Sequence, residues 1–168
     1  MTPQVSIIMG STSDLPIMQK AADFLEEMEI PFEMNALSAH RTPIAVEKFA
    51  KEAANKGVKV IIAGAGMAAH LPGVIAAMTP IPVIGVPIKA TLDGMDALLA
   101  IVQMPPGIPV ATVAINGALN AGILAAQMMA IGDKSLFDKT VAYKEALKGK
   151  IEKANQELAK VSYKYKTN

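Results

Sequence analysis

The chain has 168 residues and a mass of 17.6 kDa, which is enough for one domain with its own hydrophobic core. Hydrophobic residues make up 52% and charged residues 18%, so the composition excludes intrinsic disorder. The net charge of +1 excludes a strongly basic nucleic-acid or membrane-surface binder, and the lack of cysteine excludes disulfides and thiol nucleophiles. We expect a single domain over residues 1–168 in the cytoplasm, because Met1–Gln4 lacks the cationic start of a signal peptide.

Short runs that favour strands alternate with helical patterns along the first 131 residues. In chain order, the expected strands are residues 5–9, 32–37, 58–63, 82–86 and 110–115. The helix after each strand is expected to begin near residue 14, 43, 71, 93 and 118, with Thr42 as N-cap and Pro43 as the first helical residue of the second helix. Five such units predict an α/β fold: a three-layer, doubly wound parallel sheet of about five strands, flavodoxin-like.

The stretch from Ala97 to Gly132 contains no charged residue. A membrane span is excluded because Pro105, Pro106 and Pro109 interrupt it, so we expect a buried strand and helix. One chain of this size offers little room to hide so much apolar helix, and we expect other copies of the chain to cover part of it.

A helical extension over about 134–165 is expected to follow the last unit. It is rich in lysine and glutamate, and it is expected to pack across a neighbour. Its single apolar stripe consists of Leu147, Ile151, Ala154, Leu158 and Val161.

Functional residues are expected in the loops after the first three strands, because ligands of such sheets bind at the carboxyl ends of the strands. Those loops hold both histidines and the only arginine: His40 and Arg41 after the second strand and His70 after the third. A lone surface histidine needs no functional explanation, but three such side chains at one edge favour a site. Arginine suits an anion bound by two parallel hydrogen bonds, and histidine suits proton transfer near neutral pH.

The loop after the first strand reads Gly10-Ser11-Thr12-Ser13-Asp14 and opens a helix. Its glycine, hydroxyls and helix amides suit a phosphate, although it lacks the P-loop pattern. The alternative is that Ser13 or Asp14 only caps the helix. Because Asp14 would repel phosphate, we expect any ligand contact of Asp14 to be with sugar hydroxyls.

The segment Gly64-Ala65-Gly66-Met67-Ala68-Ala69 matches the dinucleotide pattern G-x-G-x-x-G/A weakly, since no acidic residue follows at the spacing that ribose binding needs. We interpret it as a backbone surface that a smaller ligand approaches closely. Two histidines 30 residues apart, without cysteine, predict no metal site, and there is no G-x-S-x-G nucleophile motif.

Five segments form a recognisable set: Met9–Asp14, Ser38–Pro43, Ala63–Gly73, Pro82–Pro87 and Gln103–Val110. Together they resemble the bacterial-type 5-(carboxyamino)imidazole ribonucleotide mutases of purine biosynthesis, the PurE family. The resemblance spans about residues 5–132, and its most specific parts are His-Arg-Thr-Pro and Ala-Ala-His-Leu-Pro-Gly.

The resemblance implies an isomerase that moves a carboxylate from the exocyclic nitrogen of the ribonucleotide to carbon 4 of its imidazole ring. It also implies a homo-octamer with active sites at subunit contacts, and no ATP, metal or organic cofactor. His40 is then the general acid/base, and Asp14 holds the ribose hydroxyls. The other substrate-binding residues that it implies are Ser11, Ser13 and Arg41 at the phosphate, His70 near the base, and Ser38 and Gly66 within the shared motifs.

Two departures from the family pattern affect the pocket. Met67 stands where glycine is expected in many relatives, and the segment 115–121 looks shorter than the corresponding loop of some members. Two other functions remain open: the related carboxylase, which uses carbon dioxide and the aminoimidazole ribonucleotide directly, and a non-catalytic nucleotide- or flavin-binding module of flavodoxin type. The low aromatic content, 4%, argues against a flavin site.

Overall fold

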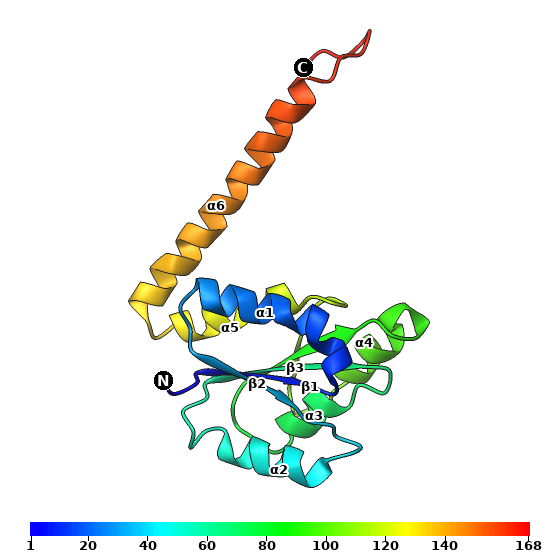
Figure 1. Cartoon of the computed structure of the whole chain (residues 1–168), viewed down its shortest axis with the longest axis vertical. Coiled ribbons are helices and arrows are strands. Elements are labelled where there is room, and N and C mark those ends of the chain that lie inside the picture. The colour runs from blue at the N-terminus through cyan, green and yellow to red at the C-terminus, as the bar shows by residue number, and fades with distance from the viewer.

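A parallel sheet of five strands forms the centre of the protein, described here by a computed structural model that covers residues 1–168 (Figure 1). The strands are β1 (Val5–Met9), β2 (Phe32–Ala36), β3 (Val60–Gly66), β4 (Val83–Ile88) and β5 (Ala111–Thr112). The α-helices are α1 (Leu15–Glu27), α2 (Pro43–Glu52), α3 (Leu71–Ala76), α4 (Met95–Val102), α5 (Ala118–Ala130) and α6 (Lys134–Ala159). The strand order β2-β1-β3-β4-β5 is that of flavodoxin-like sheets, which confirms the predicted fold.

Helices cover both faces of the sheet and give it two cores (Figure 1). Helices α1 and α5 pack on one face, and α2, α3 and α4 pack on the other. Neighbouring residues of β1 point to opposite sides, so Ile7 joins the first core and Ile8 the second. This burial on both faces explains why the strands read as continuous apolar runs.

β1 has the expected bounds, β2 and β4 differ from theirs by one or two residues at an end, and β3 and β5 differ more. β3 begins at Val60, because the amide of Val58 is still bonded to the carbonyl of Ala53 at 3.1 Å, and it continues to Gly66 instead of ending at residue 63. Its last residues pair with the end of β4, so part of the expected glycine loop is strand. β5 has only two residues, since it is an edge strand that pairs on one side and Pro109 stands two residues before it.

The charge-poor segment is partly buried by close helix packing. α5 lies directly on α1, where a β-carbon at Gly122 would come within 3.2 Å of the carbonyl oxygen of Ala21. α4, in contrast, leaves large apolar side chains exposed: Leu92 just before it, then Met95, Leu99 and Val102. No helix combines the length and the hydropathy needed to cross a bilayer.

α6 leaves the rest of the molecule after its first three turns (Figure 1). Leu136 is buried, and the ring of Tyr143 meets that of Phe24 edge-on with 5.0 Å between centroids. Every residue from 144 to 159 is exposed, and the helix ends at Ala159 instead of the expected 165. The predicted apolar stripe therefore has no partner within the chain.

Candidate active site

A hollow of about 550 Å³ lies at the carboxyl ends of the strands, at the edge where function was expected. We call it the edge hollow. The loop after β1 contributes Gly10, Ser11, Ser13 and Asp14, and the loop after β2 contributes Ser38, Ala39, His40 and Arg41. The remaining lining residues are Ala65, Gly66, Met67, Ala68, Leu71 and Ala90. Seven of the eight predicted site residues therefore line one hollow.

The loop after β1 is held by a capping box. The hydroxyl of Ser11 accepts from the amide of Ser13 at 3.3 Å, and Asp14 Oδ2 accepts from the amide of Ser11 at 3.2 Å. Ser11 caps the short 3₁₀ turn Thr12–Asp14, whereas Asp14 stands at the predicted N-cap position of α1 but makes no side-chain capping bond to that helix. Burial raises the pKa of Asp14, and the hydrogen bonds from Ser11, Ser13 and Gly10 and the charge of Arg41 oppose that rise.

The loop after β2 is closed by the hydroxyl of Thr42. This hydroxyl accepts from the amide of Ser38 at 2.9 Å and donates to the carbonyl of Ser38 at 3.1 Å. Thr42 occupies the predicted N-cap position before Pro43, but its side chain makes no capping bond to the helix. The predicted helix start at Thr42 and Pro43 is confirmed, and the hydroxyl of Thr42 closes the loop instead of capping the helix.

Arg41 joins this loop to the loop after β1. Its Nη2 donates to the carbonyl of Gly10 at 2.8 Å, and its Nε is 3.4 Å from the hydroxyl of Ser38. A guanidinium has five N–H donors, so three remain free to bind an anion in the hollow.

The two histidines contact each other. His40 Nε2 and His70 Nδ1 are 2.9 Å apart, and the rings stand nearly perpendicular at 80°. His70 precedes α3 and does not itself line the edge hollow. The structure therefore puts it against His40, a contact that the sequence could not indicate because the two residues lie on separate loops.

Backbone forms the third wall of the edge hollow. A β-carbon at Gly66 would lie 3.1 Å from the carbonyl oxygen of Ile88, so only glycine fits there without a shift of β4. Met67 follows with φ +55°, a left-handed conformation that favours glycine, and it is 57% exposed. The departure at Met67 thus leaves a strained residue at the rim of the hollow.

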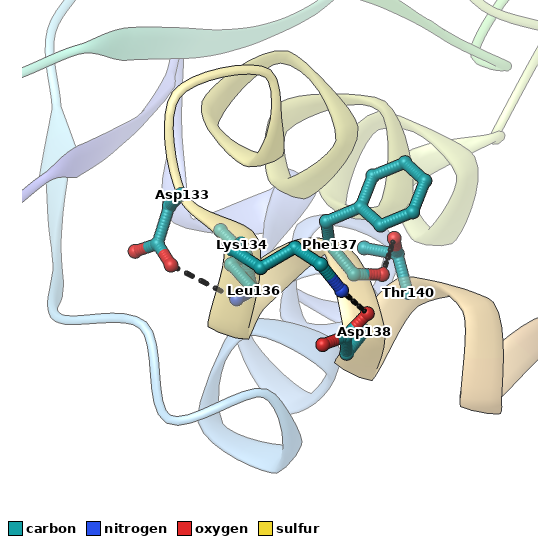
Figure 2. Close-up of polar contacts among 6 residues, drawn as sticks. All are labelled: Asp133, Lys134, Leu136, Phe137, Asp138 and Thr140. Atoms are coloured by element: carbon teal, nitrogen blue, oxygen red, sulfur yellow. Dashed lines mark hydrogen bonds and ion pairs between the residues drawn. The ribbon is translucent and has the colours of Figure 1, made fainter.

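A second, larger hollow of about 810 Å³ lies where α5 turns into α6; we call it the corner hollow. Three of its polar side chains, those of Asp133, Lys134 and Thr140, bond to near neighbours (Figure 2). Asp133 caps α6 by accepting from the amide of Leu136 at 3.0 Å, Lys134 pairs with Asp138, and Thr140 donates to the carbonyl of Phe137 at 2.7 Å. It contains no histidine or arginine, and the sequence did not indicate it.

A profile of the AIR carboxylase family matches residues 4–150. The chain belongs to this family. It is 54% identical over 163 residues to an N5-carboxyaminoimidazole ribonucleotide mutase of Thermotoga maritima, covering 96% of this chain and 95% of the relative. A crystal structure of Treponema denticola PurE superposes with a TM-score of 0.83 at 31% identity, covering 93% of this chain and 98% of the other. The resemblance inferred from the motifs is confirmed.

Members of the AIR carboxylase family carry two different names among these relatives. The mutase of Pyrococcus abyssi is 57% identical over 147 residues, covering 87% of this chain and 84% of the relative. The phosphoribosylaminoimidazole carboxylase of Candida glabrata is 56% identical over 160 residues, but the chain spans only 28% of its length. The chain thus matches whole mutases and one part of a longer carboxylase.

Three apolar side chains also line the edge hollow and were not predicted as site residues from the sequence. Ala39, Ala90 and Leu71 line the edge hollow without a polar side chain. Ala90 comes from the loop after β4, which was not predicted to contribute because an isolated alanine indicates no particular chemistry.

No group of three or more His, Cys, Asp or Glu side chains is arranged to hold a metal ion.

Proposed function

We propose that this member of the AIR carboxylase family converts 5-(carboxyamino)imidazole ribonucleotide to 5-amino-4-imidazolecarboxylate ribonucleotide in purine biosynthesis. The carboxylate moves from the exocyclic nitrogen to ring carbon 4, so the enzyme is an isomerase. One observation carries the proposal: the serine loop, the His-Arg loop and the glycine-rich strand end meet at one hollow in a chain that matches mutases over nearly its whole length.

The edge hollow offers a suitable group for each part of the ribonucleotide. The hydroxyls of Ser11 and Ser13 and the free N–H groups of Arg41 would bind the phosphate, because an anion gains most from charged and oriented donors. The Asp14 carboxylate would accept hydrogen bonds from the ribose hydroxyls. The base would then lie near His40, with Ser38, Gly66 and His70 close to it.

In the proposed reaction His40 acts first as an acid and then as a base. It protonates the exocyclic nitrogen while the carbon–nitrogen bond to the carboxylate breaks and releases carbon dioxide. Ring carbon 4 then attacks that carbon dioxide, and His40 removes the proton from carbon 4. The proton gained at nitrogen equals the proton lost at carbon, so His40 ends as it began. None of these steps calls for ATP, a metal or an organic cofactor.

Carbon dioxide must stay beside the ring between the two steps, which requires a closed, dry site. In the isolated chain His40 and Arg41 are exposed. Met67 lines the hollow and is exposed, and two more exposed apolar side chains, Leu15 and Ile44, lie in the first turns of α1 and α2, which follow the lining loops. We propose that a second copy of the chain covers this rim, in a cytoplasmic homo-oligomer, by family resemblance an octamer, that binds neither nucleic acid nor membrane.

Two further apolar surfaces support the homo-oligomer. α4 exposes Met95, Leu99 and Val102, and the outer part of α6 exposes its unpartnered stripe. Surfaces of this kind on a chain with a net charge of +1 are typical of subunit contacts. Light scattering on the purified protein at micromolar concentration tests this: a particle of several chains is expected, and a stable monomer would contradict it.

The activity is tested by incubating the protein with the carboxyamino ribonucleotide, without ATP, and measuring the carbon-4 carboxylate product. The carboxylase relative makes carbon dioxide-dependent carboxylation the second candidate. A parallel incubation with aminoimidazole ribonucleotide and bicarbonate tests it. Product from the carboxyamino compound supports the mutase, whereas product only from the second mixture would assign the chain to the carboxylases.

A further inference from the structure

The chain has two histidines, and they form a pair in which each ring is the other's only side-chain hydrogen-bond partner. The 2.9 Å separation joins Nε2 of His40 to Nδ1 of His70. At that distance one nitrogen must carry the proton and the other must present its lone pair. The contact therefore couples the tautomers of the two rings.

Neither ring is oriented by a carboxylate, which is the usual partner of a proton-transferring histidine. Arg41 follows His40 in the chain, and its guanidinium is held by Gly10 and Ser38 on the side of the β1 loop. The only carboxylate of the edge hollow is Asp14, and it accepts from Ser11. A second imidazole thus occupies the place where a carboxylate would otherwise orient the first.

We propose that His70 is a positioning residue that fixes the tautomer of His40 and shares its proton during the carboxylate transfer. This inference rests on the proposed function. Because Nε2 of His40 faces His70, the nitrogen of His40 left for the substrate is Nδ1.

The proton count of the pair follows from this arrangement. In the acid form the pair holds three protons: one on His40 Nδ1, one between the rings and one on His70 Nε2. When the first proton goes to the exocyclic nitrogen of the substrate, the pair keeps two and His40 Nδ1 has a free lone pair. That lone pair accepts the proton from carbon 4, which restores the three-proton form. Sharing the proton between the rings spreads the positive charge of the acid form over both.

Two substitutions separate this role from a packing role. His70→Phe keeps an aromatic ring edge-on to His40 but removes the nitrogen. His70→Asn offers an amide oxygen near the position of Nδ1, so it can accept from His40 Nε2 but cannot carry the shared proton. The loss of a partner that orients a metal-binding histidine typically costs 10–100-fold in affinity or activity, and we take that range as the scale for this pair. We expect kcat to fall by about that factor in His70→Phe with little change in KM, and His70→Asn to recover part of the loss.

The tautomer is read directly from the ring nitrogens by ¹⁵N NMR at about pH 8.5, where free histidine is neutral. With two histidines in the chain, one spectrum of His40→Asn assigns both rings. We expect the parent to show His40 protonated at Nε2, His70→Asn to keep that form and His70→Phe to show a mixture. Unchanged His40 signals in His70→Phe, or an unchanged kcat, would overturn the proposal.

The two tests fail independently. The NMR measurement needs no substrate, so a parent protein without mutase activity would reject the proposed function while the tautomer result still stands. If both His70 variants lose the fold, thermal melting reveals it, and the Nε2 tautomer of His40 in the intact parent remains the deciding measurement: protonation at Nδ1 instead would reject the inference.

Discussion

The edge hollow and the corner hollow differ in how many of their polar groups are free to bind a ligand. The corner hollow is larger, about 810 Å³ against 550 Å³, yet three of its polar side chains, Asp133, Lys134 and Thr140, bond to near neighbours, and most of its other lining side chains are apolar. The smaller edge hollow presents hydroxyls, guanidinium N–H groups and a ring nitrogen that come from separate loops. Volume therefore does not identify the active site here; unused, converging polar groups do.

The two hollows also arise from different parts of the sequence. The edge hollow combines short loops after four parallel strands, so residues far apart in the chain meet there. The corner hollow is built from one continuous segment, residues 127–144. Its exposed side chains Ile131, Phe137 and Val141 offer apolar area and little chemistry, which suits contact with another chain better than a reaction.

The largest expected effect is on turnover and belongs to the edge hollow. His40→Asn should reduce kcat by ~10²–10⁴-fold, because asparagine keeps similar size and hydrogen bonding but cannot transfer a proton near neutral pH. Substrate binding and assembly should change little. Lys134→Ala in the corner hollow is the matched control and should leave turnover unchanged; if Lys134→Ala were the inactive variant, the comparison of the two hollows would be reversed.

Assembly should depend on α6 and not on the edge hollow. Ile151→Glu puts a charge into the exposed stripe, where covering an isoleucine is worth about 1.5–3 kcal/mol per copy. We expect light scattering to report a smaller particle while circular dichroism shows an intact domain, since Ile151 is 65% exposed in the chain. Gln156→Glu makes the same change of charge on the opposite face of α6. If Ile151→Glu formed particles of the same size as the parent and as Gln156→Glu, the stripe would not be an interface.

Arg41→Lys tests whether the free guanidinium donors bind the phosphate. Lysine keeps the charge but cannot form two parallel hydrogen bonds, and its single nitrogen replaces the two nitrogens that contact Gly10 and Ser38. We expect the ribonucleotide to bind more weakly by roughly 1–3 kcal/mol, as measured by titration calorimetry. An unchanged affinity would mean that Arg41 only joins the two loops.

Met67→Gly should stabilise the fold slightly. A non-glycine residue at φ +55° costs about 1–2 kcal/mol of stability, which Met67→Gly would relieve. Glycine in turn costs about 0.5–1 kcal/mol, because it loses more conformational entropy on folding. The free energy of unfolding should rise by about 0.5–1 kcal/mol in urea denaturation. Ala68→Gly, at the next residue, has no positive φ to relieve and should lower it. A loss of stability in both variants would argue against strain at Met67.

The smallest effect concerns the pH dependence of stability. Burial raises the pKa of Asp14 above its ordinary value of 3.8, so the folded protein binds the proton of this carboxyl more tightly than the unfolded chain does. Stability is therefore lost as the pH rises from 3.8 through the pKa of the folded protein. Asp14→Asn removes this loss and still accepts from the amide of Ser11. Its advantage over the parent in denaturation should grow with pH and then level off; a constant difference would contradict the assignment.

Much of this molecule could be predicted from its sequence, because apolar runs and punctuating residues report directly on strands and helices. The limits of β3 could not, since glycine is a weak strand former and Ala65 and Gly66 belong to the sheet only through their pairing with β4. The side-chain bond of Thr42 depends on how its loop closes. The contact between His40 and His70 depends on the order of the strands, which brings together two loops that the sequence shows separately.

The unpartnered length of α6 has a consequence for the protein at low concentration. The helix has 26 residues, a reach of about 39 Å, and every residue from 144 to 159 is exposed. A solitary helix of that size is marginal in water, so its order depends on being covered. Dilution should therefore fray it, lower the helical signal of the sample and open the chain to proteases beyond Tyr143. The trimmed product would keep the sheet and both histidines.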